Sequence, residues 1–279
     1  MIHLYNTSAG IVALHQGNAF VLMHSSWDAL INRDDAYAHL QQMLAQTAVA
    51  GNEQWLQQQT ILPPIGSQEV WAAGVTYLRS KTARMEESKE SGGATFYDKV
   101  YDAERPELFF KATASRVRGH LQPLRIRQDS SWNVPEPELT LVITSSSKIV
   151  GYTIGNDMSS RSIEGENPLY LPQAKMYDGS AAIGPCILVL PQPIAPHTGI
   201  AMRIERMGAT VFEGATSIDR MKRTHQELVS FLYREYSHPH GCYLMTGTCV
   251  VPDNDFTLQQ ADVVHIHIDG IGTLTNSIA

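Results

Sequence analysis

The 279-residue sequence has few cysteines, no surplus of basic residues and no long apolar run. Its three cysteines cannot all pair, and none lies in a Cys-x-x-Cys motif, which indicates free thiols in a reducing compartment. Lys and Arg number 21 against 28 Asp and Glu, a formal net charge of -7, which argues against a nucleic acid or an anionic membrane as partner. No segment approaches the roughly 18 apolar residues of a membrane span, and the N-terminus lacks the basic start of a signal peptide. We therefore expect a cytoplasmic protein.

The first part of the sequence is expected to form a small α+β domain, residues 1–66. A hairpin is predicted around Gly17-Asn18, which separates two apolar runs. An amphipathic helix is predicted from Asp34 onward, because apolar residues recur there at helical spacing. The pair Pro63-Pro64 then indicates a boundary.

Residues 67–279 are expected to form a second, mainly β domain. A buried strand is predicted at residues 70–75, and beyond Leu108 short β-rich runs alternate with turn signals. One late helix is predicted over residues 219–236, with Thr216 and Asp219 in a capping box. The fold class that these patterns indicate is α+β, mainly β.

Carboxylates gather around two predicted strands. Glu136 and Glu138 lie at the start of the first, residues 139–143, and an extended backbone points them to the same face. Such neighbours repel unless a proton or a cation lies between them, although the pair taken alone is better explained as exposed glutamates on a loop. If the next strand, residues 148–155, pairs with the first as a hairpin, Asp157 reaches both glutamates. Three oxygen ligands without His or Cys suit Mg²⁺, Mn²⁺ or Ca²⁺ rather than zinc.

Lys175 is an isolated cation in the segment that follows. Near a carboxylate–metal cluster it could neutralise charge or transfer protons, and a surface lysine is the equally weighted alternative.

These residues resemble the fumarylacetoacetate hydrolase superfamily. The resemblance covers roughly residues 70–279 and rests on five ordered motifs, each weak singly. In order they are Glu136-x-Glu138, the run Gly-Tyr-Thr-x-x-Asn-Asp at 151–157, Lys-x-x-Asp-Gly at 175–179, Gly184-Pro185 and Thr246-Gly247-Thr248.

The resemblance implies a mixed β-roll preceded by the small N-terminal domain. It also implies a divalent metal held by Glu136, Glu138 and Asp157, with Lys175 near the substrate and Thr248 contacting its carboxylate or keto group. Family members usually act on 2-oxo acids or 1,3-dicarbonyls, and most are dimers or tetramers. We therefore expect a small 2-oxo acid substrate and a homodimer or homotetramer.

The lack of a histidine in one segment indicates the branch of the superfamily. Hydrolases of the family typically carry a histidine after the Gly-x-x-Tyr strand, but no histidine lies between Gly74 and Gly119 here. The sequence looks like the 2-keto-3-deoxy sugar-acid (pentonate) dehydratases, which implies Glu107 and Lys175 as proton carriers. Which of them is acid and which is base stays open, as do the stereochemistry of the sugar acid and the choice between Mg²⁺, Mn²⁺ and Ca²⁺.

Further substrate-binding candidates are Lys111 and Asp178, which lie in the matching runs, and Arg79 and Arg84, which could clamp a carboxylate or hydroxyl from a charged stretch bounded by glycines. Arg161 could brace the metal loop or lie on the surface. His265-x-His267 has strand spacing but no evident third ligand, so we expect no metal there.

Two other functions compete with dehydration. The same site could serve C–C hydrolysis of an acylpyruvate-like diketo acid or decarboxylation of oxaloacetate. A non-catalytic protein with a structural cation is the remote alternative, since such a site needs neither Glu107 nor Lys175.

Overall fold

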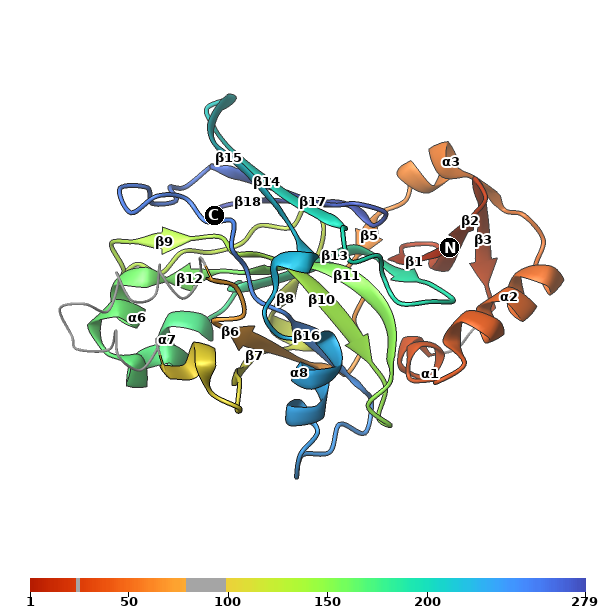
Figure 1. The fold of residues 1–279 in the computed structure, drawn as a ribbon. Helices are drawn as coiled ribbons and strands as arrows, with labels where there is room; N and C mark the ends of the chain where they lie inside the picture. The colour runs from red at the N-terminus through yellow and green to blue at the C-terminus, as the bar shows by residue number, and fades with distance from the viewer. Residues whose placement is uncertain (24–25, 79–98) are drawn as a thin grey trace.

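The computed structural model describes residues 1–23, 26–78 and 99–279, and it is mainly β with short helices (Figure 1). A large mixed sheet runs through the molecule in the order β4-β3-β2-β1-β13-β11-β10-β16-β6-β7. Its strands after the N-terminal part are β6 (Glu69–Gly74), β7 (Glu107–Thr113), β8 (Val117–Arg118), β10 (Pro137–Ile143), β11 (Ile149–Asp157), β13 (Ala181–Val189) and β16 (Cys242–Met245). β8 pairs with β13, and the β16–β6 and β13–β8 pairs are parallel.

The N-terminal part adds its own strands to this sheet. The predicted hairpin around Gly17-Asn18 is confirmed, and β1 pairs antiparallel with β13, so both parts share one continuous sheet (Figure 1). The boundary after residue 66 stays a prediction. The elements are β1 (Ile2–Thr7), β2 (Gly10–His15), β3 (Asn18–Leu22), α1 (Trp27–Ile31), α2 (Ala36–Gln46), β4 (Gly51–Asn52), α3 (Glu53–Gln57) and β5 (Ile61–Leu62), and α2 is the helix expected from Asp34.

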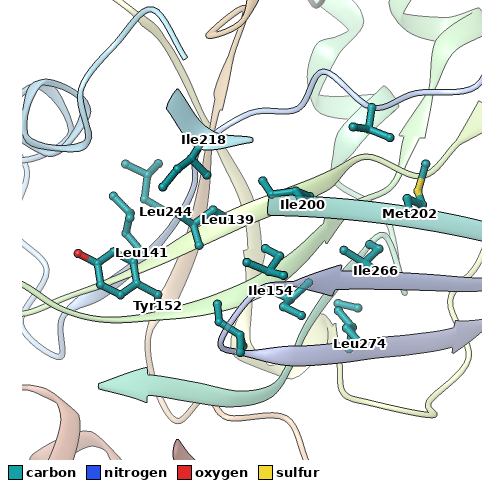
Figure 2. Close-up of a cluster of buried hydrophobic side chains, with 14 of the residues drawn as sticks. Leu139, Leu141, Tyr152, Ile154, Ile200, Met202, Ile218, Leu244, Ile266 and Leu274 are labelled. Carbon is teal, nitrogen blue, oxygen red and sulfur yellow. The ribbon is translucent and has the colours of Figure 1, made fainter. Parts of the chain in front are cut away.

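A second sheet of four strands packs on one face of the large one. Its order is β15-β14-β17-β18, formed by β14 (Gly199–Arg206), β15 (Ala209–Ser217), β17 (Val263–Ile268) and β18 (Gly272–Ser277). Figure 2 shows the apolar core where the sheets meet. Because side chains alternate along a strand, Leu139 and Leu141 of β10 point into this core, while Glu138 points to the opposite face.

The remaining elements are short. A two-stranded sheet pairs β9 (Asn133–Val134) with β12 (Ser159–Ser160), next to α6 (Arg161–Glu166) and α7 (Leu171–Lys175). Three 3-10 turns are η1 (Ala114–Arg116), η2 (Pro168–Tyr170) and η3 (Ile218–Arg220), and α8 spans His225–Leu232. No helix among the described residues has the length and apolar character needed to cross a membrane.

The prediction of one long helix over residues 219–236 is wrong. The chain forms η3 and then α8, because Met221 pairs with Tyr77 and the next amide donates to the Thr76 carbonyl at 2.9 Å. These contacts hold residues 221–222 against the end of β6. The helix cap is also different, since Thr224 Oγ1, not Thr216, accepts a hydrogen bond from the amide of Glu227 at 3.1 Å.

Candidate metal centre and active site

Three carboxylates meet where β10 begins and β11 ends. The predicted hairpin between these strands is confirmed, and its register places Glu138 opposite Gly155. The amide of Asp157 donates to the carbonyl of Glu136 at 3.0 Å, which fixes the two chain segments side by side. Ligand oxygens of Glu136, Glu138 and Asp157 all lie within 4.8 Å of one another, and all three residues are buried. This arrangement suits a divalent cation that prefers hard oxygen ligands.

Buried cations surround the carboxylates. Lys175 Nζ lies 2.6 Å from Glu136 Oε2 and 3.0 Å from Asp157 Oδ2, so it bridges two of the three. Arg161 Nη2 donates to Glu136 Oε1 at 2.6 Å, and Lys111 Nζ lies 2.5 Å from Asp157 Oδ1. The sequence left Lys175 and Arg161 undecided between the site and the surface, and the structure buries both beside the carboxylates.

Glu138 is the carboxylate that these cations do not reach. Its Oε2 accepts the amide of Gly247 at 2.6 Å, and no ion pair of the described residues includes it. Burial, reinforced by Asp157 and Glu136, raises the pKa of Glu138 well above its usual range. At Asp157 burial raises the pKa, but the nearby Lys111 and Lys175 outweigh it and the pKa is lowered. The three carboxylates therefore fit a divalent cation, which would supply the positive charge that Glu138 lacks.

Strand β7 contributes one face to the site. Glu107, Phe109 and Lys111 alternate along it, Phe109 lines the pocket, and its ring lies 5.6 Å from Lys175 Nζ. Lys111 is the extra residue of a β-bulge opposite β6, and it lies fully buried.

Lys111 has no hydrogen left to donate to a substrate. Its ammonium reaches the carbonyls of Met158 at 2.9 Å and Lys175 at 2.6 Å besides the Asp157 carboxylate, which uses all three of its protons. Burial lowers the pKa of Lys111, and Asp157 opposes that shift. In the structure Lys111 holds Asp157 and the end of α7, and its predicted role in substrate binding stays a prediction.

Another wall of the pocket is made at the carboxyl ends of two parallel strands. Gly74 ends β6 and Val75 follows it, Gly247 and Thr248 follow β16, and all four residues line the pocket with the carboxylates. Gly247 has φ +95°, and Val75 has φ +53°, a backbone conformation that costs a β-branched residue free energy. Thr76 Oγ1 joins the turns by donating to the Thr246 carbonyl at 2.7 Å.

Glu107 lies at the edge of this pocket. It pairs with Gly74 across the β6–β7 ladder, and its carboxylate lies directly against that glycine. The structure thus brings Lys175 and Thr248 to the carboxylate cluster and places Glu107 against Gly74, which lines the same pocket. A larger hollow of about 790 Å³ elsewhere contains none of the predicted residues.

Other predicted residues do not join the site. The side chain of Asp178 is 65% exposed and pairs with Arg116 at 3.4 Å, and its predicted role in substrate binding stays a prediction. Arg79 and Arg84 lie outside the described residues. His265 and His267 contact Thr275 and Thr273, each at 3.0 Å, and join no group of three metal-ligating side chains among the described residues.

Two contributors were missed by the sequence analysis. The amide of Gly247 orients Glu138, and Phe109 covers Lys175. Two signals for them were available in the sequence, the Thr-Gly-Thr motif and the alternation of Glu107, Phe109 and Lys111. Neither signal tells which other strand these residues face in the folded protein.

Fold and site together define a mainly β protein with a buried cluster of three carboxylates that fits a divalent cation and with a lysine that bridges two of them. Residues 70–279 match the family described as fumarylacetoacetate (FAA) hydrolase C-terminal, and the chain belongs to this family. The predicted resemblance is confirmed.

Its relatives include sugar-acid dehydratases. A probable 2-keto-3-deoxyxylonate dehydratase of Haloferax volcanii is 50% identical over 216 residues, which cover 77% of this chain and 73% of the relative. A 2-dehydro-3-deoxy-D-arabinonate dehydratase of Saccharolobus solfataricus is 44% identical over 220 residues, 78% of this chain and 74% of the relative. A solved structure of 2-keto-3-deoxy-D-arabinonate dehydratase complexed with magnesium and 2,5-dioxopentanoate superposes with a TM-score of 0.84 at 35% identity, covering 99% of this chain and 98% of that one.

Proposed function

We propose that this protein is a metal-dependent dehydratase that converts a 2-keto-3-deoxy-pentonate to 2,5-dioxopentanoate (2-oxoglutarate semialdehyde) and water. The observation that carries the proposal is the meeting of three buried carboxylates with Lys175 on one side and Glu107 at the pocket edge. The names of the two dehydratase relatives and the product bound in the similar structure support the same reaction.

The reaction balances as loss of water followed by a shift of two hydrogens. A proton leaves C3, the hydroxyl leaves C4 as water, and a C3=C4 double bond remains. A proton then leaves C5 and another leaves its hydroxyl, while C3 and C4 each gain one, which gives the aldehyde. Each of these steps needs a group that accepts or donates a proton at the correct carbon.

The chain offers two such groups. Glu107 and Lys175 are assigned as the proton carriers, one removing the C3 proton and the other protonating the departing hydroxyl. Thr248 is assigned to the substrate carboxylate or keto group, because it lines the pocket next to Gly247. Lys111 and Arg161 hold Asp157 and Glu136 in place.

Glu136, Glu138 and Asp157 would hold the cation, for which we propose Mg²⁺ because the similar structure contains magnesium. A bound Mg²⁺ supplies Lewis-acid stabilisation of the negative charge that develops on the 2-oxo acid. We further propose a cytoplasmic homodimer or homotetramer, which size-exclusion chromatography with light scattering tests. The three cysteines are free and buried, which agrees with a reducing compartment.

The function is tested by supplying the purified protein and Mg²⁺ with 2-keto-3-deoxy-pentonates. Formation of the semialdehyde is followed through an aldehyde dehydrogenase, and acylpyruvates and oxaloacetate are assayed in parallel. Release of water from the sugar acid is expected. Turnover of acylpyruvate or oxaloacetate alone would assign the site to the hydrolases or decarboxylases, and turnover of no candidate would favour a structural cation.

A further inference from the structure

Gly74 is a glycine that the backbone does not require. The left-handed conformation, in which glycine is favoured, falls on its neighbour Val75 at φ +53°, whereas Gly74 has no positive φ. Gly74 is thus the last residue of β6, one residue before the position at which the left-handed backbone favours glycine. Some other constraint keeps residue 74 without a side chain.

That constraint is the carboxylate of Glu107. A Cβ atom on residue 74 would lie 2.0 Å from Glu107 Oε2 and 2.6 Å from its Cδ, far inside van der Waals contact. The neighbouring backbone is not the obstacle, since the three atoms nearest to that Cβ all belong to the Glu107 side chain. The carboxyl group of Glu107 therefore occupies the space that a side chain at residue 74 would fill.

The glycine that this carboxyl group contacts lines the pocket. Gly74 lines the pocket together with Glu136, Glu138 and Phe109, and Phe109 shares one face of β7 with Glu107. Moving the carboxylate off Gly74 would change its distance and angle to a substrate held beside the carboxylate triad, although no metal ligand would move.

We infer that Gly74 is a positioning residue for proton transfer: its lack of a side chain holds the Glu107 carboxylate at the reacting carbon. The inference rests on the proposed function, since it assumes that Glu107 carries a proton. Gly74 itself exchanges no proton and acts only through Glu107.

The test is Gly74→Ala, with Gly199→Ala as the matched control. Gly199 is also a strand glycine without positive φ, and a Cβ there would meet a carboxylate oxygen, that of Asp269 at 2.7 Å, remote from the pocket lining. In G74A we expect kcat for water loss to fall about 100-fold, because small misplacements of a reacting group cost about that much. KM and the affinity for Mg²⁺, measured by calorimetry, are expected to stay within about twofold, and G199A is expected to behave as the wild type.

Two further variants distinguish a need for steric room at residue 74 from a need for a flexible backbone. In G74A/E107D the acid is one methylene shorter, so its carboxylate avoids the added Cβ but withdraws from the reacting carbon, and kcat is expected to stay as low as in G74A. In G74A/V75G the turn keeps one glycine at the left-handed position, yet kcat is expected to stay as low as in G74A. Full activity of G74A/V75G would show that the turn needs flexibility and would overturn the inference.

Other results are equally decisive. If G74A keeps more than half of the wild-type kcat, or loses Mg²⁺ binding together with activity, Gly74 does not act through Glu107. A crystal structure of G74A in which the Glu107 carboxylate has not moved would refute the inference whatever the substrate. Failure of the proposed function is distinguishable, because in that case the wild-type protein itself releases no water from the sugar acid.

Discussion

Two buried regions share the strands β10 and β11, but apolar packing stabilises one of them and interactions between charged groups dominate the other. Between the sheets, Leu139, Leu141 and Ile154 pack only against apolar side chains (Figure 2). On the other face and at the strand ends, Glu138 and Asp157 lie among like and opposite charges. The comparison teaches that the apolar face fixes the strand register, and that the register brings together carboxylates that would otherwise repel each other.

The largest expected effect comes from Glu138→Gln. Removing this proposed metal ligand should lower kcat about 1000-fold and weaken Mg²⁺ binding, because the cation would supply several kcal/mol of charge stabilisation. The metal-free variant should be at least as stable as the wild type, since a buried charge that repels its neighbours is removed. Steady-state kinetics, calorimetry and urea unfolding without metal measure these effects.

Asp262→Asn is the matched control. Asp262 is also buried, but Arg206 holds it by two hydrogen bonds of 2.8 Å and it lies outside the pocket lining. D262N should lose stability and keep its kcat, the opposite of E138Q. Full activity of E138Q would refute the proposed ligand set.

Lys175→Met should lower the stability of the metal-free protein by about 3–5 kcal/mol, because it leaves Glu136 and Asp157 buried with one cation fewer. Turnover should be lost while Mg²⁺ still binds and restores part of the stability. Urea unfolding with and without Mg²⁺ measures both. Lys148→Met, at an exposed lysine, is the control, and retained turnover in K175M would remove Lys175 from the mechanism.

Leu141→Ala tests the apolar region. The cavity should cost about 2–5 kcal/mol of unfolding free energy, while kcat of the folded protein stays near the wild-type value, because Leu141 points away from the carboxylates. Ile154→Val should cost only about 0.5–1.5 kcal/mol. A large loss of kcat in L141A at a temperature where it is fully folded would show that the two regions are coupled more tightly than the packing indicates.

The smallest expected effect is a difference in pH dependence. Because the pKa of Glu138 is raised in the folded state, its contribution to stability is present below the unfolded pKa of about 4.3 and is lost as pH rises through the folded pKa. The stability of metal-free wild type should therefore fall relative to E138Q as the pH rises. Urea midpoints at several pH values measure this, and saturating Mg²⁺ should abolish it. If the difference in urea midpoint between the wild type and E138Q does not change with pH, the pKa of Glu138 is not raised in the folded protein.

Much of the site could be predicted because its residues lie at the ends of two strands that are consecutive in the chain. Alternation set Glu138 apart from Leu139, and a short hairpin connection placed Asp157 beside it. The late helix was mispredicted because its apolar periodicity continues through residues 221–222, whereas a contact with the end of β6 interrupts the backbone there.

The sequence by itself determined the family, the alternation of the central strands and the three carboxylates, because these depend on local pattern and on motifs along the chain. Only the tertiary structure decided which cations face those carboxylates, that Lys111 is fully occupied and that Asp178 points to solvent. The contact of the Glu107 carboxylate with residue 74 is likewise visible only in the tertiary structure. The physical reason is that charge pairing and steric room depend on atoms from distant parts of the chain, whose distances no local pattern contains.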